Sequence, residues 1–503
     1  MIVSYSPYLE KYNLKIDEEK EKEKIERLLE NSRKTVVIQG LGFVGSAMVA
    51  ALTNSKDKNG SLLYNVIGVD LGNEENYWKI ARANEGKPPI ISSDKKITDA
   101  YLNAKNNKNF LATYSNTSYS KADVVVIDLQ LDIKKKSLGE VYNYDFTFEE
   151  YRKAIKSVAD NVNEDALVVV ETTVPPGTTE KIIYPIFKDS FKNRGLNINR
   201  LYLAHAPERV MPGPNYLNSI TNYHRIYSGI NLESKKLAKE FLSSFIDVKN
   251  YPLTELHSTT ASEMTKVLEN SYRSTNIAFI QEWTEFAEKA EVNLYDIISA
   301  IRVRSTHSNI MLPGFGVGGY CLTKDALLAD WSFNNLFNGE RHLDMSLNAI
   351  RINDLMPNYT FKLLKSRFNK LENINLAILG VSYLNNINDT RYSPSELFYD
   401  KCIESKIDVY LHDPIVKYWK EKDLVVNQDL SYFSNKKIDV VVFTVRHKEY
   451  LDMNPEEFIK TFENIKLIID GFNVISEENA KIFKQRDINI IGIGKSHWKK
   501  TNK

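Results

Sequence analysis

Cys321 is one of only two cysteines among 503 residues, and it follows a stretch with four glycines within six residues. The stretch reads LPGFGVGGYCLTKD from Leu312 to Asp325, so a lysine and an aspartate follow the cysteine closely. A cysteine at a helix start and near a cation is stabilised as thiolate, the nucleophilic form. Glycines allow positive φ angles and the close approach of a ligand. This pattern favours a nucleophile over a buried structural cysteine, which is otherwise the more common case.

A second group of polar residues is spaced for one face of a helix. Lys266 and Asn270 in EMTKVLEN are four positions apart, so both face the same way on a helix. Upstream, HAPERVMPGP places Glu208 and Arg209 between two prolines, directly after an apolar run. Loops at strand ends are where doubly wound sheets bind their ligands. The plainer alternatives are a solvated helix face and an ordinary exposed loop.

A glycine motif near the start of the chain indicates a dinucleotide site. Gly40, Gly42 and Gly45 form G-x-G-x-x-G between an apolar strand and a helix of small residues. The first glycine allows a tight turn, the second lets backbone approach a pyrophosphate, and the third lets the helix pack on the strand. Asp70 ends the next strand, where a carboxylate binds ribose hydroxyls and favours NAD over NADP. The alternative is a structural turn without a ligand.

These segments lie in a pattern of alternating strands and helices. The runs YNVIGVD, ADVVVID and ALVVVETT, separated by helical patterns, indicate a parallel sheet. The pattern is helical from about 255 to 311, and five further strand-like runs follow. We predict an α/β fold of two Rossmann-like doubly wound domains joined by a long-helix central domain. The predicted parts are a charged N-terminal extension (1–33), an NAD-binding domain (34–250), a helical connector with the cysteine (251–357) and a second α/β domain (358–503).

Composition excludes several classes of function. The net charge of +1 gives no field that favours nucleic acid or an acidic membrane. No apolar run approaches the roughly 20 residues of a membrane span, and the start lacks a signal-peptide core. Two cysteines make no disulfide framework, which fits a reducing cytoplasm with a free Cys321 thiol. The charged stretch KIDEEKEKEKIERLLENSRK is expected to be a solvated helix without a chemical role.

The motifs together resemble the UDP-glucose/GDP-mannose dehydrogenase family, the nucleotide-sugar 6-dehydrogenases. The matching pieces stand in family order: GLGFVG, ETTVPPGTTE, HAPERVMPG, EMTKVLENSYRSTNIAFIQE, LPGFGVGGYCLTKD, LGVSYLNNINDTRYSP and HDP. They span roughly residues 35 to 415. ERVMPG looks closest to members that oxidise UDP-N-acetylhexosamines, so the resemblance favours a substrate of that class.

The resemblance implies an NAD-dependent, four-electron oxidation of a sugar C6 alcohol to a carboxylate. The sulfur of Cys321 would attack the C6 aldehyde, and a second hydride transfer would give a thioester that water hydrolyses. Asp325 would orient or activate that water, and Glu208 would act in acid–base steps. Lys266 and Asn270 would hold the oxygen at C6. The implied catalytic residues are therefore Cys321, Lys266, Asn270, Asp325 and Glu208.

The resemblance also implies the binding residues and partners. NAD would be held by Gly40, Leu41, Gly42, Phe43, Val44, Gly45, Asp70, Thr172, Lys324 and Arg391. The substrate would contact Glu208, Arg209, Val210, Lys266, Asn270, Phe315, Gly316 and Gly318. The second α/β domain would cover UDP, and the long connector helix would form a homodimer interface. We expect a cytoplasmic enzyme with no metal site, nucleic-acid partner or membrane partner.

Three departures from the family pattern bear on the substrate. The chain has DLQLD where the family commonly has Thr-Pro after the ADVVVI strand. Leu384 stands where many members carry a lysine that contacts the nucleotide sugar. His307, with Arg304 close by, stands about where many relatives have an arginine that reaches into the neighbouring subunit. None of these positions carries the implied chemistry.

Other functions stay open at this point. UDP-glucose or GDP-mannose could be the substrate of the same reaction. A two-electron dehydrogenase of the β-hydroxyacid type would share the Rossmann start and could use Lys266, but it leaves Cys321 and the last domain unexplained. A non-enzymatic relative that only binds nucleotides is disfavoured by the intact set of catalytic residues.

Overall fold

The chain divides into two compact units, each with its own sheet and core. The computed structural model describes residues 2–7, 10–90, 92–211 and 213–502. The first unit comprises Met1–Ile133, Phe146–Val267 and Leu328–Glu340, and the second comprises Lys134–Asp145, Leu268–Leu327 and Arg341–Lys503. The predicted connector, 251–357, therefore contributes residues to both units.

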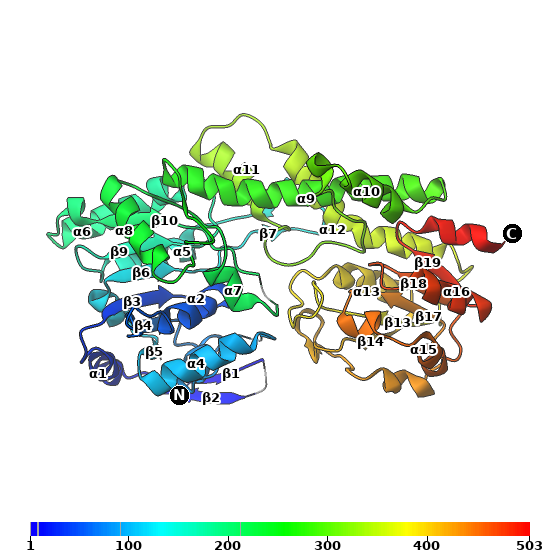
Figure 1. Cartoon of the computed structure of the whole chain (residues 1–503), viewed down its shortest axis with the longest axis horizontal. Coiled ribbons are helices and arrows are strands. Elements are labelled where there is room, and N and C mark those ends of the chain that lie inside the picture. Colours follow the sequence, from blue (N-terminus) through cyan, green and yellow to red (C-terminus); the bar gives the residue numbers. More distant parts are fainter. Residues whose placement is uncertain (1, 8–9, 91, 212, 503) are drawn as a thin grey trace. The chain divides into compact units, whose positions relative to one another are not determined.

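The first unit is built on an eight-stranded sheet in the order β12-β11-β10-β9-β6-β3-β4-β5 (Figure 1). Its strands, along the chain, are β3 (Lys34–Gln39), β4 (Tyr64–Val69), β5 (Phe110–Thr113), β6 (Val124–Ile127), β9 (Leu167–Val170), β10 (Tyr202–His205), β11 (Ile226–Gly229) and β12 (Thr254–Glu255). Neighbours are parallel except β10 and β11, which pair antiparallel. The predicted doubly wound sheet is confirmed, with one antiparallel pair that the sequence did not indicate.

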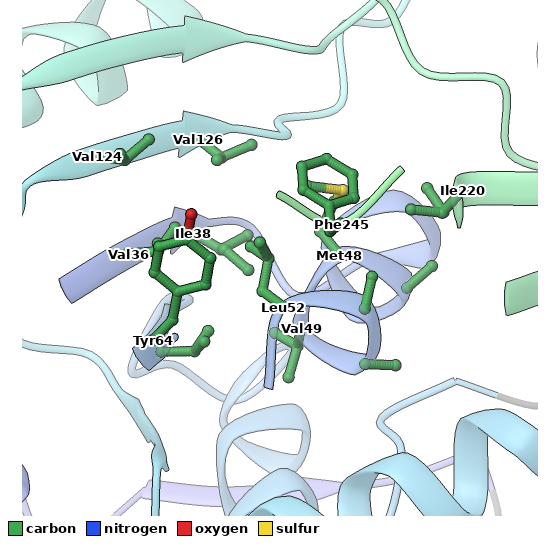
Figure 2. Packing of buried hydrophobic residues seen from close by; sticks show 14 of the residues in the cluster. Val36, Ile38, Met48, Val49, Leu52, Tyr64, Val124, Val126, Ile220 and Phe245 are labelled. Atoms are coloured by element: carbon green, nitrogen blue, oxygen red, sulfur yellow. The ribbon is translucent and has the colours of Figure 1, made fainter. Parts of the chain in front are cut away.

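Helices cover this sheet because its strands are apolar on both faces. The helices are α2 (Phe43–Thr53), α3 (Tyr77–Asn84), α4 (Lys95–Asn107), α5 (Glu149–Ala159), α6 (Tyr184–Asn193), α7 (Tyr216–Thr221) and α8 (Leu232–Ser243). Figure 2 shows Val36 and Ile38 of β3 on the side of the sheet where Met48 of α2 packs. Alternate residues of a strand share a face, so this spacing gives one continuous core under α2.

The second unit contains a five-stranded, fully parallel sheet in the order β14-β13-β17-β18-β19. The strands are β13 (Asn375–Leu379), β14 (Asp408–His412), β17 (Val440–Phe443), β18 (Leu467–Asp470) and β19 (Asn489–Gly492). Helices α13 (Pro394–Glu404), α14 (Lys448–Leu451), α15 (Pro455–Thr461) and α16 (Glu477–Gln485) lie between or after them. Short strand pairs β7–β8 (Lys134–Lys135, Tyr144–Asp145) and β15–β16 (Tyr418–Trp419, Leu424–Val425) complete the unit. All five predicted strands are confirmed.

Long helices make up the segment between the two sheets. Helix α9 runs over 31 residues, Thr259–Lys289, as its lack of glycine and proline predicts. It is followed by α10 (Leu294–Arg302), α11 (Asp325–Leu336) and α12 (Asp344–Lys365). Helix α12 continues through Pro357, so the predicted boundary after residue 357 falls inside a helix. Among the described helices none is long and apolar enough to cross a membrane.

The N-terminal extension is more than the solvated helix that its charge pattern indicates. Helix α1 (Glu18–Leu28) is present, but it buries Glu21 and Ile25. It is preceded by two paired strands, β1 (Ile2–Tyr5) and β2 (Lys11–Leu14). The prediction missed this packing because each strand is four residues long and α1 has only two buried positions.

A cluster of charged side chains is buried at the carboxyl edge of the first sheet. Asp128 and Glu171 directly follow paired residues of β6 and β9, so they stand side by side. Arg225 forms an ion pair with Glu171 and donates a 3.0 Å hydrogen bond to the carbonyl of Ala206. Both carboxyl oxygens of Asp128 are buried, and neither has a hydrogen-bond partner among the described residues. Burial, reinforced by Glu171, raises the pKa of Asp128 well above its ordinary value of 3.8.

We expect Asp128→Asn to stabilise the first unit more at pH 8 than at pH 5. Because the pKa of Asp128 is raised by folding, its stabilising contribution is present below pH 4 and is lost as pH rises towards the folded value. In that interval the free energy of unfolding of the wild type falls by about 1.4 kcal/mol per pH unit. The variant does not lose this stability, because its side-chain amide does not ionise. Thermal unfolding of the cofactor-free protein at both pH values measures the difference.

Asp132→Asn is the matched control, because Asp132 lies four residues further along the chain and is exposed. Its melting temperature should differ from wild type by the same small amount at pH 5 and pH 8. An Asp128→Asn shift that is equal at the two pH values would contradict a protonated Asp128.

Candidate active site

The turn between β3 and α2 has the geometry that the G-x-G-x-x-G spacing predicts. Gly40 has φ of +100°, and a Cβ there would lie 2.3 Å from the carbonyl oxygen of Asp128. A Cβ at Gly45 would lie 1.9 Å from the carbonyl oxygen of Gly40, whereas a Cβ at Gly42 would meet no described atom within 4 Å. Helix α2 starts after Gly42 without a side-chain cap. A helix N-terminus next to such a turn fits the pyrophosphate of a dinucleotide.

Asp70 lies beside this turn, and a lysine that the sequence analysis missed joins it. The Asp70 Oδ2 atom accepts a 3.0 Å hydrogen bond from the amide of Leu41 and lies 3.2 Å from Nζ of Lys79. Lys79 also donates to Oδ1 of Asn76 at 2.7 Å. The sequence contains no sign of this role for Lys79 beyond its position on the helix that follows the strand before Asp70. Asp70 is therefore held next to the glycine turn, as a ribose ligand must be.

Lys266 and Glu208 form a buried ion pair in the first unit. Nζ of Lys266, on α9, lies 3.0 Å from Oε1 of Glu208 and donates a 3.0 Å hydrogen bond to the carbonyl of Glu208. Burial by itself would raise the pKa of Glu208, but Lys266 and the amide of Val210 hold it below its ordinary value. Of the two flanking prolines, Pro212 lies outside the described residues. The pair thus keeps an ionised carboxylate in a dry environment.

Thr172 lies just after β9 and forms hydrogen bonds at the DLQLD segment (128–132), which departs from the family pattern. Its hydroxyl donates to the carbonyl of Ile127 at 3.2 Å and accepts from the amide of Leu129 at 3.0 Å. Arg209 and Val210, which were predicted to bind substrate, are half-buried in the loop that follows β10. Thr172 therefore orients the DLQLD segment as well as standing at the predicted cofactor position.

Cys321 lies on the turn that leads into α11. Its carbonyl accepts a 3.0 Å hydrogen bond from the amide of Asp325, the first residue of the helix. The helix thus begins four residues later than the sequence indicates. Cys321 is partly exposed, whereas Cys402 in α13 is fully buried. Of the two thiols, Cys321 is the one that a reagent or substrate can reach.

Asp325 connects the neighbours of the cysteine in the second unit. Its Oδ2 accepts a 2.6 Å hydrogen bond from the amide nitrogen of Asn270, and its Oδ1 lies 3.1 Å from Nζ of Lys324. Lys324 also lies over the ring of Tyr320, 4.4 Å from its centroid. The lysine was expected to stabilise the thiolate, but its charge is paired with Asp325. The structure thus brings Asn270, Asp325 and Lys324 together beside the cysteine turn.

The glycines before Cys321 lie where a side chain would collide with neighbouring protein atoms. A Cβ at Gly316 would lie 2.3 Å from Pro394, and one at Gly318 would lie 2.5 Å from the carbonyl of Tyr392. Gly319 has φ of +78°, as predicted, and a Cβ there would lie 2.5 Å from the Tyr383 ring. These glycines therefore allow a close approach to other protein atoms of the second unit.

Phe315 is a correction to the predicted substrate contacts. Its side chain is fully buried, and its ring packs edge-on against Phe398 with 5.5 Å between the centroids. It belongs to the apolar core of the second sheet. An aromatic residue between glycines has the same signature in a sequence whether it anchors a loop or faces a ligand. Only the backbone of Phe315 is left to contact a substrate.

Arg391 is held rigidly near the cysteine turn. It forms a two-pronged ion pair with Asp389, at 3.0 Å from Nε and 2.7 Å from the terminal nitrogen. The Arg391 guanidinium lies 5.7 Å from the ring of Tyr320, which the sequence analysis missed. Leu384, in the lysine position of many relatives, is 44% exposed. The predicted His307 lies on the exposed surface of its 3-10 turn, Ser305–His307.

Comparison with protein families matches three successive parts of the chain. Residues 34–246 match the NAD binding domain of the UDP-glucose/GDP-mannose dehydrogenase family. Residues 260–354 match its central domain, and residues 377–477 match its UDP binding domain. The three matches stand in the order that the resemblance in the sequence implies.

Individual proteins and solved structures agree with this assignment. A UDP-N-acetyl-D-mannosamine dehydrogenase of Methanococcus vannielii is 30% identical over 92% of this chain and 98% of its own. The structure of a UDP-D-ManNAc dehydrogenase from Pyrococcus horikoshii is similar with a TM-score of 0.75 and 28% identity, covering 92% of this chain and all of that one. An NDP-N-acetyl-D-galactosaminuronic acid dehydrogenase from Methanosarcina mazei has a TM-score of 0.75 and 26% identity over 94% of this chain and 98% of its own. The chain therefore belongs to the UDP-glucose/GDP-mannose dehydrogenase family and is an NAD-binding nucleotide-sugar dehydrogenase.

Proposed function

We propose that the chain oxidises C6 of a UDP-N-acetylhexosamine to the carboxylate, with UDP-N-acetyl-D-mannosamine as the first candidate. The observation that carries the reaction is the partly exposed Cys321 beside the hydrogen-bonded Asn270 and Asp325. The names of the relatives support the sugar class, because two of the three act on N-acetylhexosamine nucleotides. ERVMPG at residues 208–213 points to the same class.

Cys321 explains how one site performs two oxidations. The first oxidation removes a hydride and a proton from the C6 alcohol and leaves an aldehyde. The thiolate adds to the aldehyde carbon, and the oxygen takes up a proton to give a thiohemiacetal. Loss of a second hydride and that proton gives the thioester. Water then releases the acid and the free thiol, so one sugar consumes two NAD and one water.

The polar residues of the two units suit different steps. Asp325, which contacts both Asn270 and Lys324, would orient the hydrolytic water in the second unit. In the first unit, Lys266 supplies a cation that can stabilise an oxyanion at C6. Glu208, ionised beside that cation, can accept a proton from water or alcohol. NAD, when bound, accepts the hydride in each oxidation, and the turn from Gly40 to Gly45 with Asp70 would hold it.

Purified enzyme should form two NADH per sugar and end at the uronic acid. The measurement is NADH absorbance with a limiting amount of each of UDP-ManNAc, UDP-GlcNAc, UDP-glucose, UDP-galactose and GDP-mannose, with the product identified by mass. We expect the highest kcat/KM with UDP-ManNAc. One NADH per sugar would instead indicate the two-electron dehydrogenase.

Cys321→Ala separates the thiol chemistry from cofactor binding. The alanine cannot form the thiohemiacetal, so uronic acid formation should fall by about 10³-fold or more while NAD binding is unchanged. Cys402→Ala is the matched control, because Cys402 is buried in α13 and has no proposed role. Full uronate formation by Cys321→Ala would remove the proposed mechanism.

We further propose that the enzyme is a homodimer formed through α9. Several large apolar side chains of this helix are exposed at helical spacing: Leu268, Tyr272, Phe279, Trp283 and Phe286. Leu268 is 64% exposed and Phe286 is 62% exposed. The Phe279 and Trp283 rings pack together with 6.1 Å between centroids, and Phe286 adjoins Trp283 at 5.8 Å. A continuous apolar stripe of this kind typically pairs with another protein surface.

The double variant Phe279→Glu/Phe286→Glu should be a monomer where the wild type is a dimer. Two carboxylates on each copy would be desolvated and would repel each other across a symmetric interface. Sedimentation velocity at micromolar concentration measures the mass. Leu232→Glu, which alters an exposed leucine on α8, is the control and should leave the dimer intact. A monomeric wild type, or a dimeric double variant, would contradict this interface.

A further inference from the structure

The N-terminal segment lies outside the range of the matched NAD binding domain but is built into the same unit. That match starts at residue 34, whereas β1, β2 and α1 occupy residues 2–28. Figure 1 shows α1 near β5, at the edge of the first sheet, and residue contacts join α1 to β5 and both β1 and β2 to α3. The segment therefore borders the region in which β4 and β5 end.

Ser4 links the N-terminal segment by hydrogen bonds to the loop that follows Asp70. The Ser4 hydroxyl donates a 2.7 Å hydrogen bond to the carbonyl of Glu74 and accepts a 3.0 Å hydrogen bond from the amide of Trp78. Ser4 is completely buried. Glu10 adds an ion pair to Arg82 of α3. One side chain of β1 thus joins the loop to the start of α3.

Helix α1 contacts the other side of the same region. Glu21, which is 5% exposed, accepts a 2.6 Å hydrogen bond from the hydroxyl of Thr113 at the end of β5. The carbonyl of Thr113 in turn accepts a 3.2 Å hydrogen bond from the amide of Asp70. A Cβ at Gly72 would lie 3.0 Å from the Tyr114 ring and 3.4 Å from Ile16. The loop is therefore packed between β5 and the N-terminal segment.

The region held in this way carries Asp70, which is expected at the adenosine ribose, and Lys79, which is paired with it. Asp70 begins the loop. Lys79, whose Nζ lies 3.2 Å from Oδ2 of Asp70, directly follows Trp78, the residue whose amide donates to Ser4. Loops that are ordered before binding lose less conformational entropy when the ligand arrives. Fixing this loop in advance should therefore strengthen cofactor binding without touching the reacting carbon.

We propose that the N-terminal segment is a positioning element of the cofactor site, in which Ser4 and Glu21 hold the Asp70–Lys79 region ready for the adenosine ribose of NAD. The segment acts on the cofactor site through this loop. This role concerns the affinity for NAD alone and does not depend on which sugar is oxidised.

Ser4→Ala in the full-length protein tests the proposal. It removes both hydrogen bonds to the loop, so the Kd for NAD, measured by calorimetry without sugar, should rise about five- to tenfold. With any accepted nucleotide sugar, kcat at saturating NAD and the KM for the sugar should stay within about twofold of wild type. Ser190→Ala is the matched control: Ser190 is also buried and also loses two hydrogen bonds, to the carbonyl of Ala159 and to Asp160.

The two serine variants should lower the melting temperature alike, but only Ser4→Ala should weaken NAD binding. Glu21 provides the second comparison, because Glu21→Gln keeps an oxygen for the Thr113 hydroxyl and Glu21→Ala does not. The glutamine variant should bind NAD as wild type does, and the alanine variant should bind it more weakly. An unchanged Kd in Ser4→Ala, or an equal rise in Ser190→Ala, would overturn the proposal.

Discussion

The carbonyl oxygen of Gly40 comes so close to α2 that no side chain can stand at Gly45, where a Cβ would lie 1.9 Å away. This contact seats the start of α2 directly on the end of β3, and it leaves the helix N-terminus open at the sheet edge. The same turn brings the amide of Leu41 to the carboxylate of Asp70. The geometry of the glycine turn in the first unit depends on this single close approach between backbone segments.

Around that edge, the pKa values of two buried acids are shifted in opposite directions by their surroundings. Glu208 has Lys266 as a partner, so its pKa is lowered although the group is buried. Burial raises the pKa of Asp128, and repulsion from the neighbouring Glu171 raises it further, against the lowering effect of Arg225. Two carboxyl groups with opposite shifts can act as a base and as a proton reservoir in one domain. The sequence positions alone, both at strand ends, do not distinguish them.

In the second unit, the turn that carries Cys321 is held in place by packing against neighbouring residues. The turn with Cys321 is preceded by glycines that fit against Tyr383 and residues 392–394, and the ring of Phe315 anchors it in the core. A turn held at so many points loses little freedom on binding, which favours a nucleophile with a fixed direction of attack. The N-terminal hairpin and α1 play the corresponding part for the loop after Asp70 in the first unit.

The sequence by itself determined the uninterrupted helix α9, the glycine turn and the two sheets apart from the antiparallel β10–β11 pair. Periodicity and glycine spacing are local properties of the chain, so the sequence records them. It also indicated Cys321, Lys266, Asn270 and Asp325 as a set, since the motifs stand in family order. Only the tertiary structure decided that Lys324 pairs with Asp325 and that Phe315 is core. It alone decided that Lys79 joins Asp70 and that Ser4 fixes the loop between them. Most of these features depend on contacts between residues that are far apart in the chain. The Lys324–Asp325 pair depends on which of several nearby groups the lysine contacts. A local sequence pattern contains neither kind of information.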